Sequence, residues 1–243
     1  GTISISGSGI VDLNPNATGA SGFSGKWIIN SGATLRTTRH SQSGDWDALG
    51  SNTSSDAVTL AGGTLAVGGF TGSGAQGDWT WANPITLASS TSSTISGQLP
   101  DTTGGARVLT LTGAITGSGN LAFSKNQLRT MNFVLNNLGT TAGSKSNVMG
   151  TGDITVTGVT LTLRAGSTGN TMTHNNNINL SGATLVSDDA NQVFAGNISL
   201  SGANTIQARW SGKNATLNGT ISGSGSVTYS TANAADIVIA VNG

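Results

Sequence analysis

The sequence predicts an all-β fold in which short strands stack as the coils of a parallel β-solenoid. One observation is a ten-residue segment that occurs three times, at residues 4–13, 114–123 and 220–229. Another is a shorter unit in which an apolar residue, a small polar residue, a glycine and a second apolar residue follow one another. It occurs at residues 29–35, 60–65, 156–161, 180–185 and 200–203. Its last three glycines are about 20 to 24 residues apart, a spacing typical of stacked repeats.

The segments between the glycines have the pattern of β-strands. Apolar and hydroxyl residues alternate, as in residues 108–112 and 159–163, and Gly, Asn and Ser separate the segments. No segment has the period of an amphipathic helix, and residues 127–137 are predicted to be strand or loop. An antiparallel sandwich is the alternative all-β fold. The glycine between two apolar residues favours the solenoid, because it allows a corner with positive φ.

This interpretation makes specific structural predictions. Inward Leu, Ile, Val and Ala stack on their counterparts one coil away, so that Leu65, Leu161 and Leu185 are nearly fully buried. About ten coils of roughly 20 to 25 residues, each adding about 4.8 Å, give a rod about 50 Å long. Longer segments at 36–55, 70–83 and 131–149 are predicted to be insertions that form loops on one flank. Strands that pair in parallel with the next coil are predicted at 58–61, 64–67, 108–112, 155–157, 159–163, 178–180 and 198–200.

One elongated domain is predicted over residues 1–243, with two approximate repeats starting near residues 4 and 114 and a partial third near residue 220. Charged residues are only 8% of the chain and the formal net charge is zero. No basic stretch suggests a nucleic-acid partner, and no apolar run suggests insertion into a membrane. There is no Cys, which excludes disulfides and thiol chemistry. Because the chain starts with Gly, we expect a processed product or a fragment of a longer chain.

Residues 1–67 resemble the autotransporter-associated β-strand repeat. The resemblance is carried by residues 23–35 (FSGKWIINSGATL), 48–50 (ALG) and 58–65 (VTLAGGTL), with the lead-in at residues 6–13. Fragments of the pattern return at 114–123, 179–187 and 220–229. The resemblance implies a right-handed parallel β-helix from the passenger region of a secreted or surface-displayed bacterial protein. Passengers include adhesins, enzymes and stalks, and this sequence has no membrane-barrel domain of the kind that anchors them.

Few residues suggest catalysis or metal binding. His40 and His174 are the only histidines, and both are interpreted as residues of polar loops or turns. Asp45 with Asp47, and Asp188 with Asp189, are the acidic pairs. No Asp recurs at the repeat period as a calcium-binding solenoid would require, so no metal and no cofactor is predicted. A glycosidase pair formed by Asp45 and Asp47 stays open, since parallel β-helices include carbohydrate-active enzymes.

The tryptophans give a second possible binding function. Trp79 and Trp81 lie on the same side of one predicted strand, and Trp46 lies in another insertion. These three are the candidate glycan-binding residues, and the alternative is that they cover the open side of the apolar core. The sequence therefore predicts a structural, extracellular β-solenoid that is not an enzyme, with a carbohydrate-active enzyme or a glycan-binding module as the alternatives.

The two ends of the stack are predicted to take part in assembly. A parallel stack leaves backbone donors and acceptors unpaired at its last strands, and repeat proteins usually seal such ends with polar capping repeats. No such cap is evident in this sequence. We expect head-to-tail self-association or continuation in a longer chain, with a glycan or host surface as a further possible ligand. The candidate assembly residues are Thr2, Ile3, Ile5, Ile237, Val238, Ile239 and Val241.

Overall fold

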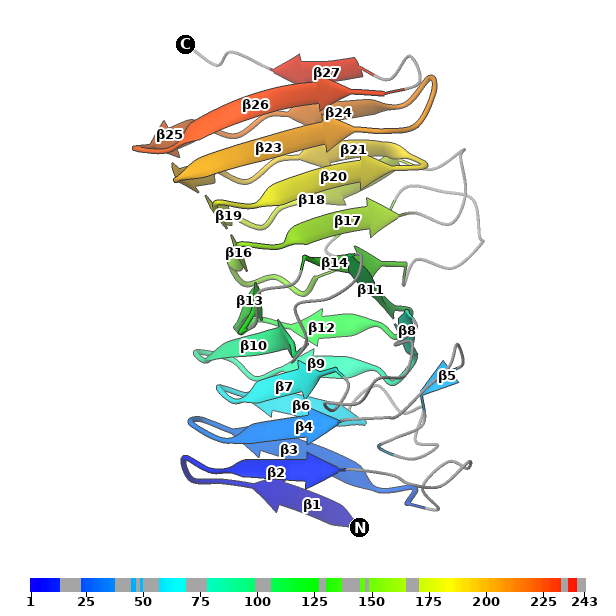
Figure 1. The fold of residues 1–243 in the computed structure, drawn as a ribbon, viewed down its shortest axis with the longest axis vertical. Helices are drawn as coiled ribbons and strands as arrows, with labels where there is room; N and C mark the ends of the chain where they lie inside the picture. The colour runs from blue at the N-terminus through cyan, green and yellow to red at the C-terminus, as the bar shows by residue number, and fades with distance from the viewer. Residues whose placement is uncertain are drawn as a thin grey trace.

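The computed structural model describes the chain with several gaps, over residues 1–13, 23–37, 45–46, 49, 57–68, 78–98, 106–126, 130–136, 145–146, 149–164, 171–232 and 236–239. All 27 secondary-structure elements in these residues are β-strands. They stack along one axis into an elongated body, with the first strands at one end and the last at the other (Figure 1). The predicted all-β solenoid is confirmed.

Sheets A and B start together at the N-terminal end of the stack. Sheet A contains, in spatial order, β1 (Thr2–Ile5), β3 (Lys26–Asn30), β6 (Val58–Ala61), β9 (Ile85–Leu87) and β12 (Ile115–Gly117). Sheet B contains β2 (Ile10–Leu13), β4 (Thr34–Thr37), β7 (Thr64–Val67), β10 (Ser92–Gly97), β13 (Asn120–Lys125), β16 (Ile154–Thr157), β19 (Ile178–Ser181), β22 (Ile198–Ser201) and β25 (Ile221–Gly223). Sheet B thus runs the length of the stack.

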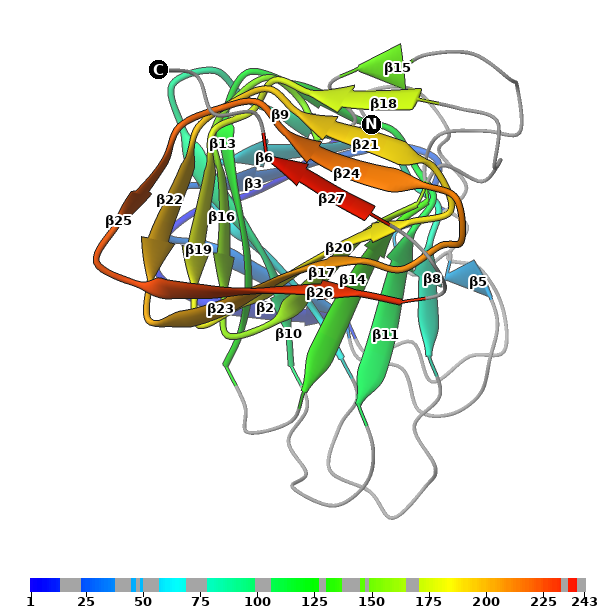
Figure 2. The same ribbon diagram turned by 90° about the horizontal axis from the view of Figure 1, so that it is seen from above.

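Sheets C and D reach the C-terminal end of the stack. Sheet C contains β5 (Asp45–Trp46), β8 (Trp79–Trp81), β11 (Arg107–Leu111), β14 (Met131–Leu135), β17 (Thr160–Arg164), β20 (Thr184–Asp188), β23 (Ala203–Ala208) and β26 (Ser226–Thr231). Sheet D contains β15 (Lys145–Ser146), β18 (Thr171–His174), β21 (Asn191–Phe194), β24 (Asn214–Leu217) and β27 (Asp236–Ile239). Seen along the axis, these sheets form the sides of a closed cross-section (Figure 2).

Every pairing between these strands is parallel. The seven strands predicted from the glycine unit are all present, within one residue at each end. Each pairs with a strand of the next coil rather than with its neighbour in sequence, so the antiparallel alternative is wrong. Sheet B has nine strands, one for each coil, slightly fewer than the ten coils predicted.

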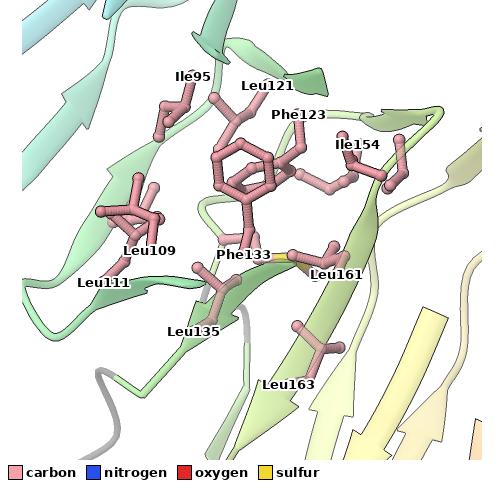
Figure 3. Packing of buried hydrophobic residues seen from close by; sticks show 14 of the residues in the cluster. Ile95, Leu109, Leu111, Leu121, Phe123, Phe133, Leu135, Ile154, Leu161 and Leu163 are labelled. Atoms are coloured by element: carbon pink, nitrogen blue, oxygen red, sulfur yellow. The ribbon is translucent and has the colours of Figure 1, made fainter. Parts of the chain in front are cut away.

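The core is a set of apolar columns that run parallel to the axis. One column on sheet B joins register partners from coil to coil and comprises Leu35, Leu65, Ile95, Phe123, Val156, Leu180 and Leu200. All seven side chains are buried. Near the middle of the stack the Phe123 and Phe133 rings pack with their centroids 5.3 Å apart (Figure 3). Leu65, Leu161 and Leu185 are each 0% exposed, which confirms the predicted burial.

The glycine unit forms the corner between consecutive strands, as predicted. Gly158, Gly182 and Gly202 have φ values of 62°, 57° and 67°. In the first coils the corner joins sheet A to sheet B, whereas in the last coils it joins sheet B to sheet C. The change occurs where β13, which follows a corner, pairs with β16, which precedes one.

Two of the predicted insertions are partly wrong. Trp79–Trp81 is β8 and Met131–Leu135 is β14, and both are regular members of sheet C. Their aromatic, Asn and Met residues obscured the alternating pattern. Inside the third segment, 36–55, Asp45–Trp46 forms the short β5 at the end of sheet C. The chain therefore interrupts its strands less than the composition of these segments suggested.

Candidate functional site

The structure does not form the predicted glycan platform from Trp79 and Trp81. These indoles are 4% and 1% exposed, so neither offers a flat face to a sugar ring. The Trp81 Nε1 group donates a hydrogen bond to the carbonyl of Asn83 at 3.0 Å. Both side chains point inward from sheet C and fill the core, as the alternative interpretation predicted. The backbone of Trp46 pairs with that of Trp81, and the Trp46 side chain lies outside the described residues.

The two acidic pairs have different outcomes. Asp47 and His40 lie outside the described residues, so the possible glycosidase pair stays a prediction. Asp188 is buried, and its Oδ2 atom accepts hydrogen bonds from Arg164 Nη2 at 2.9 Å and Arg209 Nη2 at 3.1 Å. Asp189, at φ 56°, forms a second ion pair with Arg164. Two guanidinium groups thus occupy the place that a cation would need.

His174 lies in the core rather than in a polar turn. Its Nε2 atom is 2.6 Å from Gln192 Oε1, and its ring stacks on Phe194. Gln192 donates through Nε2 to the carbonyl of Leu163, so its Oε1 accepts and His174 Nε2 carries the proton. Burial lowers the pKa of His174 to about 4, and the hydrogen bond with Gln192 offsets part of that effect. The imidazole is therefore neutral near pH 7 and has a structural role.

An amide ladder lies at the corner that precedes sheet B in the last coils. Asn177 donates through Nδ2 to Asp153 Oδ1 at 3.0 Å and accepts at Oδ1 from the backbone amide of Asn197 at 3.1 Å. Asn197 Oδ1 accepts in turn from the amide of Thr220 at 3.0 Å. These side chains satisfy backbone donors at the corners, which is the ladder role expected for outward Asn residues.

The two ends of the stack are the surfaces on which the predicted assembly residues lie. We call the outer edges of β1 and β2, with their corner at residues 6–9, the N-terminal face. The C-terminal face comprises the outer edges of β25, β26 and β27, with the corner at residues 222–225. Each of these five strands is the last in its sheet. Their outer backbone groups therefore have no strand partner among the described residues.

Large apolar side chains are exposed mainly on these two faces. In the described residues six such side chains are exposed, and only Trp210 lies away from the end coils. The other five are Ile3, Ile10 and Val11 on the first coil and Tyr229 and Val238 on the last. Ile3, Val11 and Tyr229 are register partners of the buried Trp27, Leu35 and Ile206, and no further coil covers them among the described residues.

The predicted assembly residues are only partly available on these faces. Thr2 is exposed, whereas Ile5 is 6% exposed and belongs to the core, so it offers its backbone edge rather than its side chain. Ile237 packs partly against the core. Ile239 belongs to β27 but its side chain is not described, and Val241 lies outside the described residues.

The described residues contain neither a metal-binding cluster nor a membrane-spanning helix. No three His, Asp or Glu side chains in this part gather closely enough to hold a metal ion. Nor does this part contain a helix with the length and apolar character needed to cross a lipid bilayer.

The fold is a parallel β-solenoid, and the outer edges of its first and last strands have no strand partner among the described residues. No family model, no curated protein and no solved structure matches the chain.

Sequence reasoning did not find the Arg164–Asp188–Arg209 contact. A signal was present, because Arg164 is followed by Asp188 and then by Arg209 at intervals of 24 and 21 residues, which is the coil spacing. The exposed residues Ile10, Val11 and Tyr229 were also missed as candidates for the end faces. Each occupies the strand that follows a Gly-Ser-Gly corner.

Proposed function

We propose that this chain is a rigid rod segment of a secreted or surface-displayed bacterial protein. In this role it acts as a stalk or passenger that holds other parts of the protein, or a binding partner, at a distance from the cell. The observation that carries the proposal is sheet B, whose nine parallel strands run through every coil. A continuous sheet over a continuous core resists bending, because a bend would break hydrogen bonds and core contacts in several coils together.

The chemistry of the described side chains supports a mechanical role. The indoles of Trp79 and Trp81 are in the core, His174 is neutral and buried, and Asp188 is held by two arginines. These groups contribute to packing and to side-chain ladders. The resemblance of residues 1–67 to the autotransporter-associated repeat supports export to the bacterial surface, and the absence of Cys is compatible with it.

The proposal predicts that function depends on the number of coils and not on the identity of one coil. Ile178 and Ile198 are register partners, so removal of residues 178–197 deletes β19, β20 and β21 and joins two equivalent positions. We expect this variant to fold and to shorten the rod by about 4.8 Å, the spacing of one strand. A control deletion of residues 178–187 removes half a coil and puts all later strands on the wrong side.

The decisive experiment places each variant between an outer-membrane anchor and a reporter domain on bacterial cells. If the chain acts as a spacer, the reporter should be fully displayed with the complete chain and with the one-coil deletion. In the second case the reporter should lie closer to the membrane. The half-coil deletion should abolish display. Loss of display in the one-coil deletion, or hydrolysis of a polysaccharide by the purified chain, would contradict the spacer function and favour the enzyme alternative.

A further inference from the structure

Two arginines from alternate coils meet above one buried carboxylate at the end of sheet C. Arg164 ends β17, Asp188 ends β20 and Arg209 follows β23, so the three residues occupy the same position on successive coils. The Asp188 side chain is 1% exposed, whereas those of Arg164 and Arg209 are 37% and 43% exposed. The negative charge therefore lies beneath the surface, and the two guanidinium groups form the outer layer.

The two guanidinium groups share one oxygen of this carboxylate. Arg164 donates to Asp188 Oδ2 through Nε at 3.3 Å and through Nη2 at 2.9 Å, and Arg209 donates to the same oxygen through Nη2 at 3.1 Å. The other oxygen, Oδ1, is buried and has no hydrogen-bond partner among the described residues. A guanidinium group binds a carboxylate best through two parallel N–H bonds, one to each oxygen. Neither arginine makes this paired contact with Asp188.

The second carboxylate of the cluster also lies on the inner side. Asp189 is 14% exposed, and its Oδ2 atom is 3.7 Å from Arg164 Nε, the same edge of the guanidinium group that faces Asp188. The Nη1 group of Arg164 lies on the opposite edge. Because both acids approach from within, the outer edge of Arg164 is suited to an acid group that comes from outside the chain.

The turn that follows Arg209 carries an exposed aromatic ring. Trp210 is 45% exposed. Its carbonyl accepts a hydrogen bond from the Lys213 amide at 3.1 Å, and Gly212 has a φ of 68°, so the turn is closed. Lys213 adds a third cation, and Asp236 follows it in sheet D of the next coil. In these coils the corners between sheets C and D lie one above another along one edge of the rod (Figures 1 and 2).

We propose that this edge binds an acidic sugar chain. A uronate carboxylate lies on the guanidinium groups of Arg164 and Arg209, and a sugar ring packs on the indole of Trp210. The cationic outer layer is complementary to the uronate charge, in a chain of which only 8% of the residues are charged. Asp188 holds both guanidinium groups from beneath, so that little side-chain entropy is lost on binding.

The arrangement favours a carbohydrate over a nucleic acid. Three cations at one corner are fewer than the basic track that a nucleic-acid backbone requires. Arg164 and Arg209 are two strand spacings apart, about 10 Å along the axis at the backbone, so an extended ligand can meet both. The site lies on the flank of the rod and adds a binding function to its role as a spacer.

Titration calorimetry of the purified chain with an oligomer of galacturonate is the first test. We expect binding that weakens as the salt concentration rises, because the contact is between exposed charges. The methyl ester of the same oligomer keeps the sugar rings and has no negative charge. It should bind about tenfold more weakly or worse, since the charge-assisted hydrogen bonds are lost.

Lysine substitutions test the guanidinium groups without leaving Asp188 unpaired. Arg164→Lys and Arg209→Lys each keep a cation beside Asp188 but remove the planar fork, and each should weaken binding about tenfold. Arg36→Lys makes the same change in the ion pair with Asp12 on sheet B. It is the control and should leave the affinity for the oligomer unchanged. Circular dichroism spectra identical to that of the original chain show that the variants are folded.

A substitution at Trp210 tests the aromatic contact separately. Trp210→Ala should weaken binding of the galacturonate oligomer about three- to tenfold, because the ring contact is lost while the charges remain. Trp210→Phe keeps an aromatic face and should recover most of the affinity. The salt dependence of binding should stay the same in both variants.

Three results would overturn the site: no binding of the galacturonate oligomer, equal binding of its methyl ester, or an affinity that the substitutions at Arg164, Arg209 and Trp210 lower no more than Arg36→Lys does. The titration and the display assay can fail separately. A chain that binds the oligomer but gives no display would keep this site and lose the spacer function, and a chain that is displayed but does not bind would do the reverse.

Discussion

The N-terminal and C-terminal halves of the solenoid have the same core but different coils. In the first half, register partners in adjacent coils are 24 to 35 residues apart, as for Thr2 with Lys26 and Asp45 with Thr80. In the second half the corresponding separations are 20 to 24, as for Asn177 with Asn197. The inward column on sheet B continues through both halves without a break. The pairing of apolar columns therefore fixes the fold, and the length of each coil is free to vary.

The two halves also satisfy their polar groups in different ways. In the N-terminal half, Trp27 donates through Nε1 to the carbonyl of Leu49, and Trp81 does so to Asn83. In the C-terminal half, Asn side chains bond the corners of successive coils to one another. Indole donors thus anchor carbonyls in the N-terminal half, whereas Asn side chains join successive coils in both halves, as Asn30 does through the carbonyl of Ile5. Predictions that act on one half alone test this division.

The largest expected effect is common to both halves and concerns the apolar column. Leu65→Ala in the N-terminal half and Leu185→Ala in the C-terminal half should each lower the free energy of unfolding by about 2–5 kcal/mol, because each removes a fully buried side chain and leaves a cavity. Hydrogen exchange by mass spectrometry should locate each loss in the coils next to the substitution, since solenoid stability is a sum over neighbours. Ser199→Ala on the exposed face is the control. Equal deprotection of the whole chain by both variants would contradict independent halves.

The next effect should be confined to the C-terminal half and depends on pH. The pKa of His174 is about 4 in the folded chain, against 6.5 for an unperturbed group. Between these values the unfolded chain binds more protons, so the free energy of unfolding falls as the pH falls from 6.5 to 4. The loss should reach roughly 3 kcal/mol, and below pH 4 this group adds no further change.

His174→Gln is the matched variant for this prediction, because its amide can still donate to Gln192 and cannot titrate. Urea unfolding between pH 7 and pH 4 should show the pH-dependent loss for the original chain and a flatter profile for the variant. Hydrogen exchange should place the acid-sensitive opening around β18 and β21, with the N-terminal coils unaffected. Identical profiles for the two proteins would show that His174 is not the group responsible.

The sequence was sufficient to predict the strands that follow a glycine corner, because corner and alternation together specify position and direction. It assigned β8 and β14 to insertions, although it placed Trp79 and Trp81 on one strand and left residues 127–137 as strand or loop; in the structure Trp79, Trp81 and Met131 are buried in the core. A large side chain can fill the same column when the coil around it is longer. The alternating pattern does not show how much volume an inward side chain can fill, because that volume depends on the length of the coil.

The end faces were predicted from the same logic, but the side chains on them were not. Ile5 was a candidate assembly residue and is buried, whereas Val11 and Tyr229 were not candidates and are exposed. An alternating pattern shows which residues share a side, not whether a neighbouring coil covers them. The place of His174 in the core was also missed, because a His beside three Asn residues has the composition of a turn.

A smaller effect is expected for the amide ladder, and again only in the second half. Asn197→Ala removes the acceptor for the backbone amide of Thr220 and the coil-to-coil bond with it. Because this site is exposed and water can replace the acceptor, the free energy of unfolding should fall by only about 0.5–1.5 kcal/mol. Exchange of the Thr220 amide should become faster while that of the Leu65 amide stays the same. No change at Thr220 would show that the ladder is not part of what stabilises the short coils.

The smallest effect is expected for the ion pair in the N-terminal half. Arg36 hydrogen-bonds to Asp12 across β2 and β4 and lowers the pKa of that carboxyl group. The pair therefore stabilises the folded chain above the ordinary carboxyl pKa, and the contribution is lost as the pH falls through the lowered pKa. Both side chains are partly exposed, at 33% for Asp12 and 27% for Arg36. Asp12→Asn should thus lower the free energy of unfolding by less than about 1 kcal/mol at neutral pH, and this decrease should disappear in high salt.

The matched measurement in the other half uses Arg209→Ala, whose partner Asp188 is 1% exposed. Because water and salt reach that carboxylate poorly, the cost of Arg209→Ala should be larger and should persist in high salt. Equal salt sensitivity of the two variants would contradict a difference in burial between the halves.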